Sequence, residues 1–159
     1  MPAAVLLLAL YMIIFGFSAQ DGEQSGSISR LISERCVEFI NSLSGRHWSA
    51  VFMEKLAEYF EHPIRKLAHF SEYTAMGILV YLIWSQWLPR GRKLYLLTVL
   101  WVFVSAAADE FHQLFVPGRY GSLADVFLDT CGGAFGVLVC VIIGKMHKKR
   151  RSRLPQSKK

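Results

Sequence analysis

The chain has 159 residues, a length that suits a single domain, and 53% of them are hydrophobic. The apolar residues are gathered into long blocks, which excludes the dispersed pattern of a soluble core and indicates a membrane protein. Lys and Arg outnumber Asp and Glu by 18 to 12, but the excess lies in two short segments, so we expect it to set membrane orientation rather than to bind nucleic acid.

Four apolar blocks predict an all-α, polytopic membrane protein with four transmembrane helices. The blocks cover residues 3–17, 67–88, 94–116 and 123–144. Each approaches the roughly 20 residues needed to cross about 30 Å of hydrocarbon. The first block is short enough to be a signal-peptide core, but no Lys or Arg precedes it and Gly16-Phe17-Ser18 is a mediocre cleavage site. We therefore expect a retained helix and one membrane domain over residues 1–159.

Residues 18–65 form a long, charged segment between the first two predicted spans. Apolar residues recur in it at near-helical spacing, first from Ile28 to Leu43 and again from Trp48 to Phe60. Charged residues occupy the other faces, which predicts two short amphipathic helices joined near Ser44 and Gly45. Such helices lie on the outer leaflet as a connector or pack over the bundle as a lid, and both interpretations remain open.

The distribution of basic residues predicts the topology. Residues 89–93 carry three Lys and Arg, the tail 145–159 carries eight, and neither segment contains an acid. The positive-inside rule places both segments in the cytoplasm. Four spans then put both termini in the cytoplasm and leave residues 18–65 and 117–122 outside.

Ionisable side chains occur within the predicted spans at matching depths. They are Glu72, Asp109, Glu110, Asp125 and Asp129, with His69 and His112. At 1.5 Å per residue they lie in two tiers, about 22–24 and 27–28 Å above the cytoplasmic helix ends. Charges in hydrocarbon are costly and usually face a bundle interior or a wet cavity. A single ion pair would be bundle scaffolding, whereas a whole layer predicts a polar pocket that opens outward.

Helical spacing agrees with this depth. Arg65, His69 and Glu72 follow an i, i+4, i+7 stripe and share one face, as do Asp125 and Asp129 at i, i+4.

The last span also carries packing and capping signals. Gly132-x-x-x-Gly136 allows close approach of a neighbouring helix, for which Ala106 to Ala108 offer a matching small surface. Ser122-x-x-Asp125 has the form of a capping box, so Asp125 is also a candidate to close the helix N-terminus.

The polar residues form four motifs in chain order. These are Ser18-x-Gln20, Arg65-Lys66-x-x-His69-Phe70-x-Glu72-Tyr73, Asp109-Glu110-x-His112-Gln113-x-Phe115-x-Pro117-Gly118-Arg119 and Asp125-x-x-x-Asp129-x-x-Gly132. Their order and spacing resemble the VanZ-like family from about residue 10 to 145. The resemblance implies a bacterial, multi-pass protein of the cytoplasmic membrane, in a family named for an accessory protein that lowers susceptibility to teicoplanin. It defines no reaction, so an influence on glycopeptide susceptibility is an expectation of the resemblance alone.

We expect the pocket to recognise or modify an anionic component of the cell envelope, reached from the outer leaflet or the wall. Arginine and lysine side chains suit phosphate or carboxylate. The residues assigned to ligand binding are Arg65, Lys66, Tyr73, Gln113, Arg119, Asp125, Asp129, Ser18 and Gln20. Membrane lipids are the expected partners, nucleic acid is not, and no cofactor or metal is assigned.

Two other functional classes remain open. One is an intramembrane acid–base or metal-dependent hydrolase or transferase acting on a lipid-linked substrate. Its catalytic residues would be His69, Glu72, Asp109, Glu110 and His112. The other is a proton-coupled lipid transporter subunit, although four helices without an internal repeat are few for a carrier. Since the sequence contains no serine nucleophile elbow and no His-Glu-x-x-His motif, it does not decide whether the protein is an enzyme.

Overall fold

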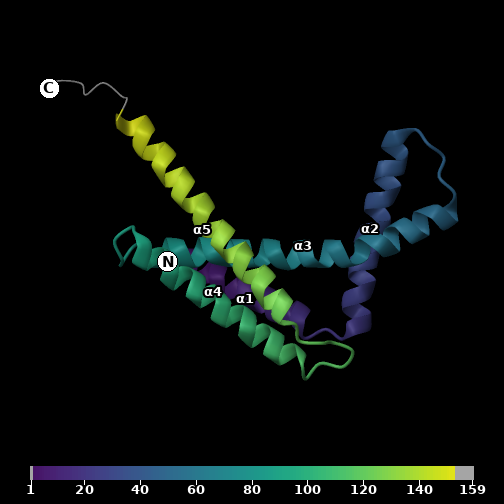
Figure 1. Cartoon of the computed structure of the whole chain (residues 1–159), viewed down its shortest axis with the longest axis horizontal. Coiled ribbons are helices and arrows are strands. Elements are labelled where there is room, and N and C mark those ends of the chain that lie inside the picture. Colours follow the sequence, from purple (N-terminus) through teal and green to yellow (C-terminus); the bar gives the residue numbers. More distant parts are fainter. Residues whose placement is uncertain (1, 153–159) are drawn as a thin grey trace.

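The computed structural model describes residues 2–152, and within them it contains five helices and no strand (Figure 1). The helices are α1 (Pro2–Ser18), α2 (Gly22–Ser44), α3 (Ala50–Trp84), α4 (Arg92–Gln113) and α5 (Leu123–Ser152). The prediction of an all-α fold is confirmed. The end of the predicted basic tail, residues 153–159, lies outside the described residues.

The first amphipathic helix of the predicted external segment is α2. Its N-terminus is capped by Asp21, whose side chain accepts a hydrogen bond of 2.7 Å from the backbone N–H of Gln24. It ends at Gly45, which has a φ of 62°, the left-handed conformation that glycine adopts without strain. The predicted join near Ser44 and Gly45 is therefore where the chain turns.

The prediction of a separate second amphipathic helix is wrong, because those residues belong to α3. This helix has 35 residues, starts at the N-cap Ser49 and passes through Pro63. Proline usually interrupts a helix because it has no N–H, but packing against α2 holds this part of α3. The Ser33 hydroxyl donates to the backbone oxygen of Ala57 at 2.5 Å, and Val37 and Ala57 are buried.

The bounds of three helices differ from those predicted. Arg65 and Lys66 lie in the middle of α3 rather than at its start, and α3 ends at Trp84 instead of residue 88. Helix α4 ends at Gln113 rather than 116, before the turn that contains Pro117. Helix α5 continues past residue 144 through Lys145 and the following basic residues to Ser152.

Close packing of α3 against α5 is the main contact of the bundle. A Cβ atom at Gly132 would lie 2.5 Å from the backbone oxygen of Phe70, and one at Gly136 would meet the backbone oxygen of Thr74. The Thr74 hydroxyl lies 3.0 Å from the Gly132 oxygen. The predicted close approach is thus present, but its partner is α3 and not the alanines of α4.

An apolar core lies beside these contacts. It joins Tyr73, Met76 and Val80 of α3 with residues from α1, α4 and α5, namely Ile14, Val102, Ala106 and Val126. The polar groups follow directly above Tyr73 on α3, so the core supports the layer from below.

By length and composition, two of the described helices can cross a membrane: Arg92–Gln113 and the part of α5 from Leu123 to Arg150. Helices α1 and α2 pass the same test together, but they meet at an angle of 107°. The described residues therefore contain two candidate spans, or three if the bent pair is one span, and the expected number of four is not confirmed. Figure 1 shows the N-terminus, the α3–α4 turn and the far end of α5 at one side of the molecule, with the α1–α2 junction and the α4–α5 loop at the other.

Candidate functional site

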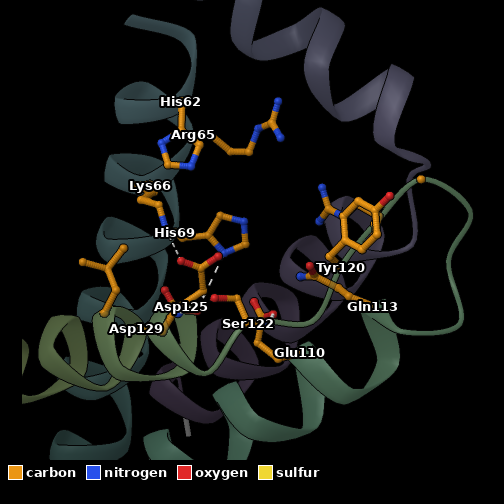
Figure 2. A pocket seen from close by; sticks show the side chains of 13 residues that line it. His62, Arg65, Lys66, His69, Glu110, Gln113, Tyr120, Ser122, Asp125 and Asp129 are labelled. Atoms are coloured by element: carbon orange, nitrogen blue, oxygen red, sulfur yellow. Dashed lines mark hydrogen bonds and ion pairs between the residues drawn. The ribbon is translucent and has the colours of Figure 1, made fainter.

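A polar cavity of about 340 Å³ lies between α3, the start of α5 and the end of α4 (Figure 2). Helix α3 contributes His62, Arg65, Lys66 and His69. Helix α4 and the loop after it contribute Glu110, Gln113, Gly118, Arg119, Tyr120 and Ser122. Helix α5 contributes Asp125, Leu128 and Asp129. Residues up to 67 positions apart along the chain, His62 and Asp129, therefore share one cavity.

Two acid–base pairs connect α3 to α5 across this cavity. Lys66 forms an ion pair with Asp125, and both side chains are about one-third exposed. One turn deeper, Nδ1 of His69 lies 3.8 Å from Oδ2 of Asp129, too far for a hydrogen bond. Asp129 is fully buried, and neither of its carboxylate oxygens has a hydrogen-bond partner among the described residues. The deepest acid of the cavity is therefore desolvated and unsatisfied.

The acids of α4 have separate partners. Oε2 of Glu110 accepts a hydrogen bond of 2.7 Å from the backbone N–H of Ser122, and Nε2 of Gln113 donates to Oδ2 of Asp109 at 3.1 Å. Ser122 also caps α5, since its hydroxyl accepts from the backbone N–H of Asp125 at 3.4 Å. The capping role predicted for this motif thus belongs to Ser122, while the Asp125 carboxylate points to Lys66.

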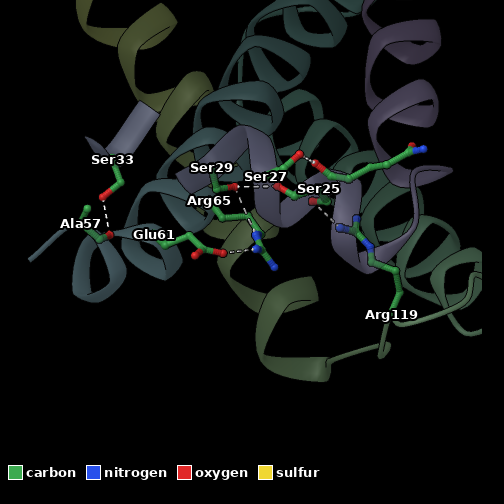
Figure 3. Close-up of polar contacts among 9 residues, drawn as sticks. Ser25, Ser27, Ser29, Ser33, Ala57, Glu61, Arg65 and Arg119 are labelled. Atoms are coloured by element: carbon green, nitrogen blue, oxygen red, sulfur yellow. Dashed lines mark hydrogen bonds and ion pairs between the residues drawn. The ribbon is translucent and has the colours of Figure 1, made fainter. Parts of the chain in front are cut away.

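Arg119 reaches the cavity from the α4–α5 loop (Figure 3). Its Nη1 donates to the Ser25 hydroxyl at 2.7 Å, its Nε is buried without a partner, and among the described residues it forms no ion pair. Burial, with a further contribution from the charge of Arg65, lowers the pKa of Arg119 from its ordinary value. An arginine nonetheless stays protonated in proteins, so the guanidinium is a positive charge that Asp109 and Glu110 stabilise without forming an ion pair.

Arg65 faces the same cavity from α3 and has more partners. Its Nη2 donates to Oε1 of Glu61 at 2.9 Å, one turn earlier on the helix, and its Nε lies 3.4 Å from the Ser29 hydroxyl. Figure 3 shows that the two guanidinium groups are attached to α2 through serines that lie one turn apart.

The α4–α5 loop is anchored at the start of α2. The backbone N–H of Gly22 donates to the oxygen of Pro117 at 3.2 Å, and Gly118 has a φ of 71°. A Cβ atom at Gly22 would collide with the backbone oxygen of Gly118, so glycine is required for this approach. The contact fixes where Arg119 enters the cavity.

The other predicted site residues lie around the cavity rather than in its wall. Gln20 and Glu72 line a second cavity of about 140 Å³, which shares Arg65 and His69 with the first. Tyr73 is fully buried in the apolar core, and His112 packs against Phe15 with ring centroids 4.7 Å apart. Asp109 and Ser18 are buried at the ends of their helices. The predicted layer is thus two adjoining cavities with buried neighbours.

Four polar residues at the site were not predicted, namely Ser25, Ser29, His62 and Tyr120. Their signal is present in the sequence. Ser25, Ser29 and Ser33 are spaced by four residues and so share one face of α2. Within the described part of the chain, no group of three or more His, Cys, Asp or Glu is arranged to hold a metal ion.

Comparison with known proteins agrees with the motifs. The family model for VanZ/LLP1 matches residues 3–144, which includes every residue of the polar cavity. No curated protein and no solved structure matches the chain. Together with the helices that can cross a membrane, the match confirms the resemblance: the chain is a membrane protein that belongs to the VanZ/LLP1 family.

Proposed function

We propose that the polar cavity faces the outer side of the cytoplasmic membrane and binds an anionic component of the cell envelope through Arg119 and Arg65. The observation that carries the proposal is that Arg119 has no ion-pair partner among the described residues. Lys66 is paired with Asp125 and Arg65 with Glu61, whereas the one hydrogen bond of the Arg119 side chain within the described residues is to the hydroxyl of Ser25. Asp109 and Glu110 interact with the half-buried guanidinium without forming an ion pair, and a phosphate or carboxylate in the cavity would supply a direct counter-charge.

The chemistry of the group favours an oxyanion. A guanidinium presents a planar fork that can form two parallel hydrogen bonds to phosphate or carboxylate. Nη1 of Arg119 donates to Ser25 and Nε is buried, so Nη2 is the group of this guanidinium left for such a ligand. Arg65, on the facing helix, lines the same cavity.

Four spans and cytoplasmic termini complete the proposal. The spans are α1, the apolar second half of α3, α4 and α5, with the 18–65 segment and the α4–α5 loop outside. In support, the basic α3–α4 turn and the basic end of α5 lie at the same side of the molecule in Figure 1, as the positive-inside rule requires. The N-terminus of α1 lies there too.

A second candidate function is acid–base catalysis on a lipid-linked substrate. Its supporting observation is the pair of His69 and Asp129, both of which line the cavity with buried atoms that lack hydrogen-bond partners. A histidine oriented by a buried carboxylate can transfer a proton. Turnover of a lipid phosphate by the purified protein, absent in His69→Gln, is the result that would favour this function over binding alone.

Retention of lipid by the purified protein tests the binding proposal. Native mass spectrometry is applied to protein reconstituted with equal amounts of phosphatidylglycerol, which is anionic, and phosphatidylcholine, which is zwitterionic. We expect phosphatidylglycerol to be retained preferentially. Arg119→Lys should reduce retention although the charge is kept, because an ammonium cannot form the paired hydrogen bonds.

The matched control is Lys66→Arg, which also exchanges one cation for the other but at a side chain that Asp125 neutralises. It should retain phosphatidylglycerol as the wild type does. Equal retention by wild type and Arg119→Lys would contradict the proposal and leave Arg119 as a loop anchor on Ser25. If the retained component is one that teicoplanin reaches, we also expect the protein to influence susceptibility to this antibiotic. Comparing the teicoplanin susceptibility of a deletion strain with that of its parent strain tests this part of the proposal.

A further inference from the structure

An apolar groove of about 460 Å³ lies directly beside the polar cavity, between α4 and α5. Its apolar wall includes Phe103, Ala107 and Leu114 on the α4 side and Val126 and Phe127 on the α5 side. Most ligand pockets of this size combine apolar walls with a few polar groups at fixed positions. Here the polar groups at the rim are Glu110, Ser122 and Thr130.

The groove and the polar cavity share a wall. Glu110 and Ser122 line both, and they are joined by the hydrogen bond from the Ser122 N–H to the Glu110 carboxylate. Along the loop, Tyr120 lines the polar cavity, Gly121 lines the groove and Ser122 lines both. The ridge between the two spaces is therefore only a few residues thick and carries no side chain at Gly121.

Gly121, at the ridge, packs tightly against the end of α4. A Cβ atom at Gly121 would lie 2.7 Å from the backbone oxygen of Glu110 and 2.9 Å from Cδ2 of Leu114. The loop thus rests directly on the last turn of α4, where no larger residue fits without displacement. A molecule that spans the ridge passes from the cavity that Arg119 lines to the apolar groove across Glu110 and Ser122, which line both.

Resting on the proposed anion binding, we infer that the ligand is a membrane lipid, whose anionic head occupies the polar cavity beside Arg119 and whose hydrocarbon chain lies in the groove between α4 and α5. The inference excludes a soluble phosphate or a wall polymer without a lipid anchor as the full ligand. Charge complementarity at one end and apolar walls at the other identify the occupant, because only an amphiphile matches both spaces. A transmembrane helix of another protein, or of a second copy, would fill the groove and leave Arg119 without an ion-pair partner.

A photoactivatable lipid locates the chain. The full-length protein is reconstituted into phosphatidylcholine vesicles with a small amount of phosphatidylglycerol that carries a diazirine in one acyl chain, and labelled residues are mapped by mass spectrometry. We expect labels on the groove residues, such as Leu114 and Phe127. Arg119→Gln should weaken this labelling about tenfold or more, the effect of losing a charge-assisted contact. Phosphatidylcholine with the same diazirine should label these residues weakly, and free sn-glycerol 3-phosphate should not displace the anionic lipid.

Variants that fill the groove, compared with a control variant outside it, test where the hydrocarbon chain lies. Ala107→Phe on α4 and Thr130→Phe on α5 each place a large side chain in it, and both should lower the retention of phosphatidylglycerol. Val104→Phe is the control, since Val104 is a 57% exposed residue of the same helix that lines neither space. Ala107 also packs against the apolar core, so Thr130→Phe carries the test if Ala107→Phe does not give a monodisperse, helical protein.

The possible failures are distinct. If the wild type retains no phosphatidylglycerol, the proposed function itself is wrong. If retention depends on Arg119 but both groove-filled variants retain the lipid as the wild type does, anion binding stands and the inference fails. Labelling that is equal for the two lipids and insensitive to Arg119 would show unselective bilayer contact only. Cross-linking of the groove to a second protein chain would also overturn the inference, because the groove would then be an interface.

Discussion

His69 and Asp129 face each other across the α3–α5 contact, with Nδ1 and Oδ2 separated by 3.8 Å and no hydrogen bond to either atom. The Asp129 side chain has no exposure to solvent. A buried carboxylate without hydrogen bonds destabilises a fold, and a nearby imidazole compensates only in part at this distance. Whether the pair contributes to the stability of the fold can be measured on a variant that keeps the shape of Asp129 and removes its charge.

Asp129→Asn should therefore leave the free energy of unfolding unchanged or raise it by about 1 kcal/mol, because the variant removes an unsatisfied buried carboxylate and keeps its shape. Thermal unfolding of the purified protein in detergent measures this. A loss of about 3–5 kcal/mol, typical of breaking a buried ion pair, would instead make Asp129 a structural partner of His69. Asp125→Asn is the control, since its pair with Lys66 is one-third exposed and worth at most about 1 kcal/mol.

Because α3 packs closely on α5, the effect of replacing a glycine of α5 on the free energy of unfolding should depend strongly on its position. Gly132→Ala should lower the free energy of unfolding by about 1–3 kcal/mol, the usual cost of overpacking, because its Cβ would lie 2.5 Å from the Phe70 oxygen. Gly144→Ala, on the same helix with nothing within 4 Å of the new Cβ, should be neutral or gain up to about 1 kcal/mol from helix propensity. Equal stabilities of the two variants would contradict the packing described here.

The site was predictable from sequence to the extent that helical spacing controls it. Arg65, His69 and Asp129 face one cavity because residues four apart along a helix share a face and because α3 packs on α5. What spacing does not reveal is which helices meet. The sequence predicts that Gly132 and Gly136 of α5 meet the alanines of α4, whereas both contact α3.

The missed features have a similar origin. The predicted separation of the second amphipathic helix from the next span is absent because contacts of α2 with α3, including Ser33 with Ala57, keep α3 continuous through Pro63. Glu72 and Asp129 have matching depths, yet they face different cavities because depth along a helix says nothing of the direction of a side chain. The role of Ser25 depends on the α4–α5 loop reaching α2, a contact between residues 94 positions apart.

Cysteine labelling of intact cells with a membrane-impermeant maleimide tests the proposed topology. Gly91→Cys in the α3–α4 turn should be unreactive from outside, and Tyr120→Cys in the α4–α5 loop should react. Both sites tolerate the change, because nothing lies within 4 Å of a Cβ at Gly91 and Tyr120 is 88% exposed. Both are made in a Cys36→Ser background, since Cys36 is exposed on α2. The reverse pattern of reactivity would invert the orientation and close the cavity to outer-leaflet ligands.

The contact between the start of α2 and the α4–α5 loop should control ligand retention from outside the cavity. Gly22→Ala introduces a Cβ that collides with the Gly118 oxygen, so the loop must move, and Arg119, the next residue, moves with it. We expect this variant to keep its helical content and to lose phosphatidylglycerol in native mass spectrometry to about the same degree as Arg119→Lys.

Gly26→Ala, one turn further along α2, brings its Cβ only to ordinary contact at 3.6 Å from Arg65 and Glu61 and should retain the lipid. Because neither glycine lines the polar cavity, a difference between the two variants reports the position of the loop. If Gly22→Ala retains lipid as Gly26→Ala does, the loop accommodates the collision without displacing Arg119, and the anchor has no part in binding.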